Sequence, residues 1–386
     1  MSKNKLILFF AALLAVTAAK ADVETSDKVV ISELQVEPGS SSNYTFSVNL
    51  QGENNYYTAV QIDLTLPDGL DVVYSDDKLN VQMPTDVINS LYPYDMQSMT
   101  IPGYGTLNVP VLKHQLSSNM ISSNILRVII SSQENKVFTK TSGELFNVTV
   151  QASPYLKPGD AEIGVSAKLV TIDEVKHIPA AYTSTSVKAT NTSTLTLKVS
   201  DSSKFGTCIL PFDYELPTDG SLKAYTCDNC TSEEMLLTSV QSNKMEAYTP
   251  YILYAPNGYT ATISGTVDAT KYPEEGYVKQ GYLVGTVVKK ELTEQTSYIM
   301  QNQGSGAKFY HVGATPFVLN EGKCYAELSS GASARSLIMS DDATGIESTI
   351  STGSEPTIIY NLNGQRVTKM LPNRIYIVDG KKVINK

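Results

Sequence analysis

Tryptophan is absent from this 386-residue chain, and histidine is scarce. The three histidines, His114, His177 and His311, lie far apart in the sequence and belong to no motif. A Ser-His-Asp hydrolase needs a nucleophile, an imidazole and a carboxylate in contact, and the G-x-S-x-G turn that often carries the serine is missing as well. The sequence also lacks an EF-hand loop and a glycine-rich phosphate loop. We therefore predict no catalytic residues, no metal site and no cofactor, and a protein that is not an enzyme.

Long apolar runs are missing except at the N-terminus. There, Lys3 and Lys5 precede the uncharged run Leu6–Val16, and the small-x-small sequence Ala19–Ala21 follows it. A positive segment, a short apolar run and small residues are typical of a signal peptide, which we predict over residues 1–21. The run is shorter than the roughly 20 residues that span a bilayer. We therefore expect an exported protein without a transmembrane segment, located at the cell surface or outside the cell, with the periplasm as the other option.

Positive charge is in the minority. The formal net charge is −9, and it becomes −12 once Lys3, Lys5 and Lys20 are removed with the predicted signal peptide. Binding to nucleic acid or to an anionic membrane depends on clustered basic residues, because they neutralise phosphates. We therefore expect no nucleic-acid partner.

Cysteine occurs only in the second half of the chain, at Cys208, Cys227, Cys230 and Cys324. Disulfides are the first expectation for an exported protein, because the compartments outside the cytoplasm are oxidising. Cys227 and Cys230 have the CxxC spacing, which fits a disulfide or an inert thiol pair first, and a zinc site or a redox pair as alternatives. The sequence leaves the connectivity open.

Alternating apolar residues, separated by turn residues, dominate the first half. Tyrosine, threonine, valine, isoleucine and serine are abundant, and glycine and proline punctuate the chain often, as in β-sandwiches. We expect strands over Lys28–Gln35, Asn43–Leu50, Val60–Leu66, Ile125–Ile130, Gly143–Gln151, Ala161–Val170 and Ser184–Ala189. We expect one short helix, over Thr85–Tyr92. These elements predict a first domain over residues 22–190.

Three sequence stretches of this first half resemble the cohesin family. They are Val36–Gly39 ahead of an alternating strand, Tyr57–Leu70 with its Pro-Asp-Gly turn, and Gly143–Val148. The resemblance implies a cohesin-like jelly-roll sandwich of nine strands. Cohesins occur in scaffold proteins of polysaccharide-degrading complexes and in bacterial surface proteins, so the resemblance implies a binding or scaffold role.

A second β-domain is predicted over residues 195–339, after a Thr- and Ser-rich linker over 188–194. Its stretches Ile209–Pro217, Lys223–Tyr225, Thr249–Leu253 and Gly322–Ala326 resemble a motif of surface proteins in the Bacteroides group. That resemblance implies no activity.

The C-terminal segment follows a polar linker over residues 340–356. Ile358–Val367 reads as two strands around an Asn-Gly turn, and Arg374–Ile384 repeats the arrangement around Asp-Gly. This segment, 357–386, resembles the C-terminal sorting domains of the Bacteroidetes type IX secretion pathway. A small terminal β-hairpin module that packs on the second domain is the alternative.

Two further residue patterns have a functional and a purely structural interpretation. Adjacent carboxylates could form a glycosidase pair, but they lie in turn-rich context that favours solvated loops; they are Asp76–Asp77, Glu233–Glu234, Glu274–Glu275 and Asp341–Asp342. Clustered tyrosines could stack on sugar rings or could pack in the sandwich core; they are Tyr56–Tyr57, Tyr92 with Tyr94, and Tyr248 with Tyr251 and Tyr254.

The fold class that we expect is all-β: a cohesin-like jelly-roll β-sandwich, a second β-domain and a short C-terminal β-hairpin module. The function that we expect is a non-enzymatic, secreted or cell-surface binding or scaffold protein, whose partner is an extracellular protein or polysaccharide. Two alternatives remain. One is a carbohydrate-binding accessory protein, or an enzyme with a carboxylate pair in a loop. The other is a structural subunit of a surface layer or fimbria.

Overall fold

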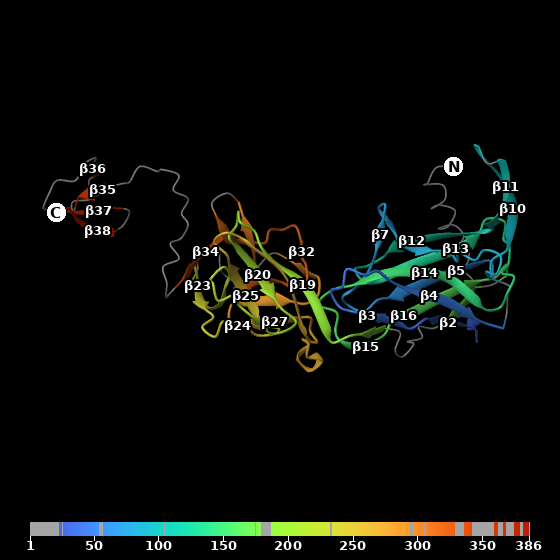
Figure 1. The fold of residues 1–386 in the computed structure, drawn as a ribbon, viewed down its shortest axis with the longest axis horizontal. Helices are drawn as coiled ribbons and strands as arrows, with labels where there is room; N and C mark the ends of the chain where they lie inside the picture. The colour runs from blue at the N-terminus through green and yellow to red at the C-terminus, as the bar shows by residue number, and fades with distance from the viewer. Residues whose placement is uncertain are drawn as a thin grey trace.

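The computed structural model describes residues 23–24, 26–53, 57–103, 105–173, 175–178, 187–231, 234–293, 296–303, 306–328, 336–341, 359–361, 366–367, 374–378 and 381–385. Strands dominate these ranges, and the one helical segment described within them is a 3₁₀ turn, η1 (Ala269–Lys271). The all-β prediction is confirmed. Two β-units follow one another along the long axis of the molecule (Figure 1).

Two facing sheets make up the first unit. One contains β1 (Val23–Glu24), β17 (Val175–Ile178), β16 (Gly164–Val170), β5 (Ala59–Thr65), β13 (Ile125–Ser132) and β12 (His114–Met120), in that spatial order. In the other, β2 (Lys28–Ile31), β4 (Tyr44–Gln51), β14 (Gly143–Ala152) and β6 (Leu70–Val72) are neighbours, and β9 (Val81–Gln82) also pairs with β14. Smaller sheets are formed by β15 (Gly159–Ala161), β18 (Val187–Ala189) and β3 (Leu34–Val36), by β7 (Tyr74–Ser75) and β8 (Lys78–Leu79), and by β10 (Tyr94–Ile101) and β11 (Gly105–Leu112).

Period-two alternation explains why these segments form a sandwich. In β4 the side chains of Phe46, Val48 and Leu50 are buried, and β14 contributes Phe146 and Val148 from the same sheet. The residues between them are more exposed, because successive side chains of a strand point to opposite faces. Burying each large apolar side chain is worth about 1.5–3 kcal/mol, so the shared core holds the two sheets together.

The helix expected over Thr85–Tyr92 is wrong; the structure has turns and bends there. The Asp86 carboxylate accepts hydrogen bonds from both the backbone and the side-chain amide of Asn89, at 3.0 and 2.9 Å. Such local bonds offer the backbone an alternative to helix. Pro93 directly follows the segment, and proline disfavours helical backbone at the residue before it.

The second unit is a curled ten-stranded sheet with three short pairs around it. The spatial order in the large sheet is β20 (Phe205–Ile209), β25 (Pro250–Tyr254), β22 (Lys223–Cys230), β23 (Glu234–Ser239), β34 (Ser336–Asp341), β31 (Ala307–His311), β30 (Ser297–Asn302), β33 (Lys323–Glu327), β28 (Leu283–Thr286) and β27 (Tyr277–Gln280). The pairs are β19 (Thr192–Val199) with β26 (Tyr259–Thr266), β21 (Tyr214–Glu215) with β24 (Lys244–Met245), and β29 (Lys290–Leu292) with β32 (Phe317–Leu319). Three buried clusters replace the single core of the first unit.

Strands occupy most of residues 188–194, where we expected a linker. Strand β18 ends at Ala189 and β19 begins at Thr192. Ser193 is fully buried and donates a hydrogen bond to the carbonyl oxygen of Pro154, at 2.7 Å. The connection between the two units is therefore part of their packing.

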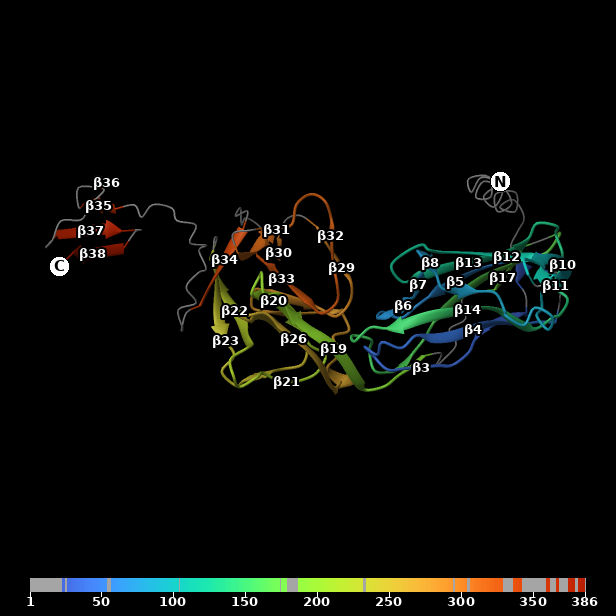
Figure 2. The ribbon, with the colours of Figure 1, turned by 45° about the horizontal axis from the view of Figure 1, so that its top comes forward.

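Side chains of the first unit also reach into the second. The Tyr155 hydroxyl donates to the carbonyl oxygen of Ile209 at 2.9 Å, and the Tyr155 ring belongs to a core cluster of the second unit. At the surface, Lys289 of the second unit pairs with Asp71 of the first, at 2.8 Å. These contacts join the two units, and Figure 2 shows the units lying end to end.

The C-terminal segment forms a separate four-stranded sheet in the order β36 (Arg366–Val367), β35 (Ile359–Asn361), β37 (Arg374–Val378) and β38 (Lys381–Asn385). Strand β35 pairs with β36, and β37 pairs with β38, both antiparallel, as the two turn motifs predicted. The predicted signal peptide, most of the predicted linker over 340–356 and both turn dipeptides lie outside the described residues.

Candidate functional site

The three histidines lie in different parts of the structure. His114 is buried at the start of β12, between the rings of Tyr92 and Phe138, with centroid distances of 5.1 and 5.2 Å. Burial lowers the pKa of His114 to about 4. His311 lies in the second unit, and His177 lies in β17 with its side chain outside the described part. Among the described residues, no group of three or more metal-binding side chains is brought together.

The adjacent carboxylates lie in exposed turns wherever both are described. Asp76 and Asp77 connect β7 to β8 with positive φ angles of 49° and 61°, as a tight hairpin turn requires. Glu274 and Glu275 are also exposed. Glu233 and Asp342 lie outside the described residues.

Most of the clustered tyrosines serve the core. Tyr57 and Tyr92 are buried in the first unit, and Tyr248 and Tyr251 are buried in the second. Tyr254 is half-buried against Phe205, and Tyr56 lies outside the described residues. Tyr94 is different: it is exposed, and it begins β10.

The four cysteines, which we expected to form disulfides, are thiols in this structure. Cys208, Cys227 and Cys324 are buried, and Cys230 is half-buried. Burial raises the pKa of Cys208 and of Cys227 to about 12, so neither is a nucleophile at neutral pH.

A two-stranded hairpin stands apart from both sandwich sheets. It consists of β10 and β11, which we call the arm, and it lies at the end of the first unit that is remote from the second (Figure 1). Eight residue pairs run from Tyr94 opposite Leu112 to Ile101 opposite Gly105. A lone two-stranded hairpin is only marginally stable in water, so its retention here needs an explanation.

Apolar side chains are exposed on both faces of the arm. One face carries Tyr94 and Met96, which are 37% and 59% exposed. On the other face Met99 lies opposite Leu107, and these are 53% and 48% exposed. Soluble proteins rarely leave such residues clustered on a surface unless a partner covers them. Methionine also adapts well to varied partner surfaces, because its side chain is flexible and polarizable.

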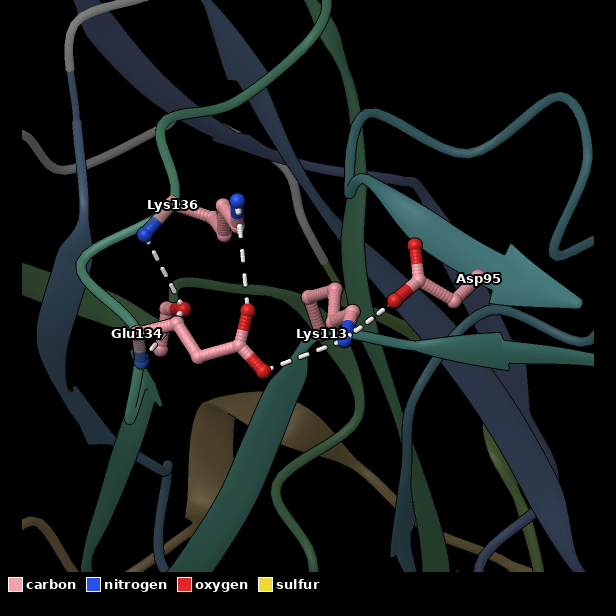
Figure 3. A network of polar contacts seen from close by, with 5 residues as sticks. Asp95, Lys113, Glu134 and Lys136 are labelled. Atoms are coloured by element: carbon pink, nitrogen blue, oxygen red, sulfur yellow. Dashed lines mark hydrogen bonds and ion pairs between the residues drawn. The ribbon is translucent and has the colours of Figure 1, made fainter. Parts of the chain in front are cut away.

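Charge is confined to the base of the arm. Between Tyr94 and Leu112 the single charged residue is Asp95, and it forms an ion pair with Lys113. Lys113 also pairs with Glu134 at 3.1 Å, which links the arm to the turn that follows β13 (Figure 3). These hydrogen bonds raise the pKa of Lys113, so its charge persists at neutral pH. The charges thus lie at the base of the arm, while the rest of the arm is neutral.

Backbone geometry gives the direction in which Pro110 of β11 points. The Lys113 amide donates to Pro93 ahead of β10, and the Ile121 amide donates to Ile125 in β13. Amides an even number of residues apart in a strand point to the same side, so β10 and β13 flank the same edge of the segment 105–121. Pro110 is out of phase with these amides, so its nitrogen faces the other, unpaired edge. Proline there disfavours strand addition along this edge of β11, and the exposed apolar side chains lie on the two faces of the arm.

The sequence prediction missed the arm. Pro102–Gly103 and Pro110 interrupt the pattern, and serine and threonine alternate with the apolar residues of β10. Two signals were present: a Pro-Gly turn between two β-prone stretches, and a near-complete absence of charge over residues 94–112.

No family model and no curated protein matches this chain. Solved structures do, at low similarity. A cohesin module of a family 33 glycoside hydrolase from Clostridium perfringens is 7% identical, with a TM-score of 0.29, over 43% of this chain and 98% of the module. The sixth cohesin of scaffoldin B from Acetivibrio cellulolyticus, solved in complex with a dockerin, is 16% identical, with a TM-score of 0.29, over 43% and 99%.

A cohesin–dockerin complex from Clostridium thermocellum gives 13% identity and a TM-score of 0.28, over 42% of this chain and 98% of the matched one. No helix within the described ranges is long and apolar enough to cross a membrane. The structures that this chain resembles are thus cohesin modules, the family that its sequence motifs suggested, and at these scores its function has to be argued from its own surface.

Proposed function

We propose that this chain is a non-enzymatic, exported binding protein that holds a partner protein through the side-chain faces of the arm. The observation that carries the proposal is the exposed, uncharged, apolar surface on β10 and β11. Protein interfaces are depleted of charge at their core and enriched in methionine and aromatic residues. The arm has this composition, whereas its base holds the charges.

The partner surface is an uncharged apolar groove. A groove can cover both faces of a projecting hairpin. It would bury Met99 and Leu107, which this chain leaves exposed. A cationic or anionic groove would have to give up its hydration without gaining an opposite charge in return. A glycan fits less well, because the arm offers Tyr94 as the one described aromatic platform.

The sequence supports further parts of the proposal at the two ends of the chain. Residues 1–21 carry the signal-peptide pattern, which supports export. Residues 357–386 resemble sorting domains of Bacteroidetes surface proteins, which supports display of the 22–190 and 195–339 domains outside the cell. Mass measurement of the protein from its native host tests both: the expected chain begins at Asp22 and has lost the residues from Ile358 onward.

The arm is tested with displayed peptides. Random 12-residue peptides on phage are selected on the full chain, and the recovered peptides are synthesised and titrated by fluorescence anisotropy. We expect apolar, uncharged peptides whose affinity falls at least tenfold on Met99→Glu or Leu107→Glu, since a charge in the contact costs more than about 1.4 kcal/mol.

Ser117→Glu is the matched control, because it places the same charge on the exposed side of β12 outside the arm. It should leave affinity unchanged. A selection whose peptides bind Met99→Glu and Leu107→Glu as tightly as the original chain contradicts the proposal.

A further inference from the structure

A pair of cysteines lies at the junction of the two units, away from the arm. Cys208 is in β20 and Cys324 is in β33, and the Cys324 thiol donates a hydrogen bond to the carbonyl oxygen of Cys208 at 3.0 Å. The Cys324 amide donates to the hydroxyl of Thr207, at 3.1 Å. The two strands therefore meet at the cysteines.

The distance between the sulfurs is bounded by this contact. A cysteine sulfur and the carbonyl oxygen of the same residue are four bonds apart and lie at most roughly 5 Å from each other. The sulfurs of Cys208 and Cys324 are thus at most about 8 Å apart, and a disulfide requires that side-chain rotation and strand movement bring them to about 2 Å. Both residues belong to the same buried apolar cluster.

The pair lines the socket that receives the first unit. Tyr155 lies in the same cluster, and its hydroxyl bonds to Ile209, the residue next to Cys208. Gly322 lies two residues before Cys324, and a Cβ atom at that position would collide with the Tyr155 hydroxyl. Ile209 in β20 and Gly322, which directly precedes β33, therefore both lie against the tyrosine.

We propose that Cys208 and Cys324 form a disulfide bond that staples β20 to β33 and fixes the walls of the Tyr155 socket. In this step each thiol loses its hydrogen, one sulfur–sulfur bond forms, and the two electrons and two protons pass to a disulfide oxidant such as oxidised glutathione, which becomes two thiols. Burial of both residues in the folded chain means that the bond forms during folding, before the socket closes.

The CxxC cysteines provide an internal comparison. The Cys227 thiol donates to the carbonyl oxygen of Asn229, and the Cys230 thiol donates to that of Thr231, each at 3.3 Å. Both thiols are thus directed to the backbone of their own segment. A bond between them would close a four-residue loop, whereas the Cys208–Cys324 bond closes a long one, and longer loops give larger stabilisation.

The test is refolding of the full chain from urea, with reduced and oxidised glutathione or with dithiothreitol. Free thiols are then alkylated in denaturant, and the protein is digested without reduction for mass spectrometry. We expect a cross-linked peptide pair containing Cys208 and Cys324, and a melting temperature about 10 °C higher than that of the reduced chain. Cys230→Ser should keep this difference, and Cys208→Ser and Cys324→Ser should lose it.

Peptide mapping of the unaltered chain decides the matter even if a serine variant fails to fold. Four alkylated thiols in the folded, oxidised protein overturn the proposal. So does a bond confined to Cys227 and Cys230, or glutathione attached to Cys208 or Cys324 in place of their mutual bond.

Discussion

The arm and the strand pair β12–β13 that follows it come from one stretch of chain, yet the first leaves its apolar side chains exposed and the second buries them. Strands β11 and β12 are separated by Lys113 alone, and each pairs with an antiparallel partner of similar length. Beside β12, strand β13 buries Leu126, Val128 and Ile130 in the sandwich core, whereas β11 leaves Leu107 exposed. Strand pairing alone thus does not make a hairpin part of the sandwich. A hairpin becomes part of the sandwich when a second sheet covers one of its faces.

Removing a core side chain should give the largest effect on stability. Phe146→Ala in β14 is expected to lower the free energy of unfolding by about 3–5 kcal/mol, because the ring is fully buried and leaves a cavity. Leu107→Ala on the arm should change it by less than about 0.5 kcal/mol. Urea denaturation followed by circular dichroism measures both. Equal losses in the two variants would show that the arm is packed against the rest of the chain.

The buried histidine at the start of β12 should give the next largest effect. Its pKa is lowered to about 4 in the folded chain, against about 6.5 when unfolded. Between these values the unfolded chain binds a proton that the folded chain excludes, so stability falls as the pH drops from about 6.5 to 4, by about 2–3 kcal/mol.

His114→Phe should remove this part of the pH dependence, because phenylalanine fits between Tyr92 and Phe138 and does not titrate in that range. The comparison is made by urea titrations at several pH values between 4 and 7. Parallel curves for the two proteins would mean that His114 is accessible to protons in the folded chain.

Breaking the ion pairs at the base of the arm should give the smallest effect on the stability of the whole chain. It should have a clear effect on hydrogen exchange within the arm. Lys113→Ala removes the ammonium group that pairs with both Asp95 and Glu134, and Glu134 keeps its second partner, Lys136. The melting temperature should stay within about 2 °C, since exposed ion pairs contribute little. Hydrogen exchange of the β10 and β11 amides should become faster, and that of β5 should not change. Unchanged exchange in the arm would show that the Pro93–Lys113 backbone bond holds it without the charges.

The sandwich could be predicted from the sequence because its burial pattern is local. Phe46, Val48 and Leu50 alternate with polar residues, and the same face of the strand is buried along its length. The arm could not be predicted this way, because it has no buried face to impose a pattern. The expected helix before it failed because the Asp86 side chain competes for backbone amides.

The packing between the two units also could not be predicted from the sequence. Thr and Ser near residue 190 are typical of a linker, and only the fold shows that Ser193 is buried against Pro154. The cysteines were recognised as candidates for disulfides, but their pairing depends on which strands of a ten-stranded sheet curl together, and Cys208 and Cys324 are distant in the sequence. The burial of Ser193 and the proximity of Cys208 to Cys324 both depend on contacts between segments that are distant in the sequence.

The strand that connects the two units has a mechanical consequence. Only Thr190 and Asn191 separate β18 from β19; the Thr190 amide binds Val36, and the Asn191 carbonyl binds Val267. A pulling force that enters at one unit reaches the other with no slack to absorb it. The hydrogen bonds of β19 with β26 would bear that load together, as a ladder pulled along its length. If the arm binds a partner as proposed, this connection would hold that partner at a fixed distance from the second unit.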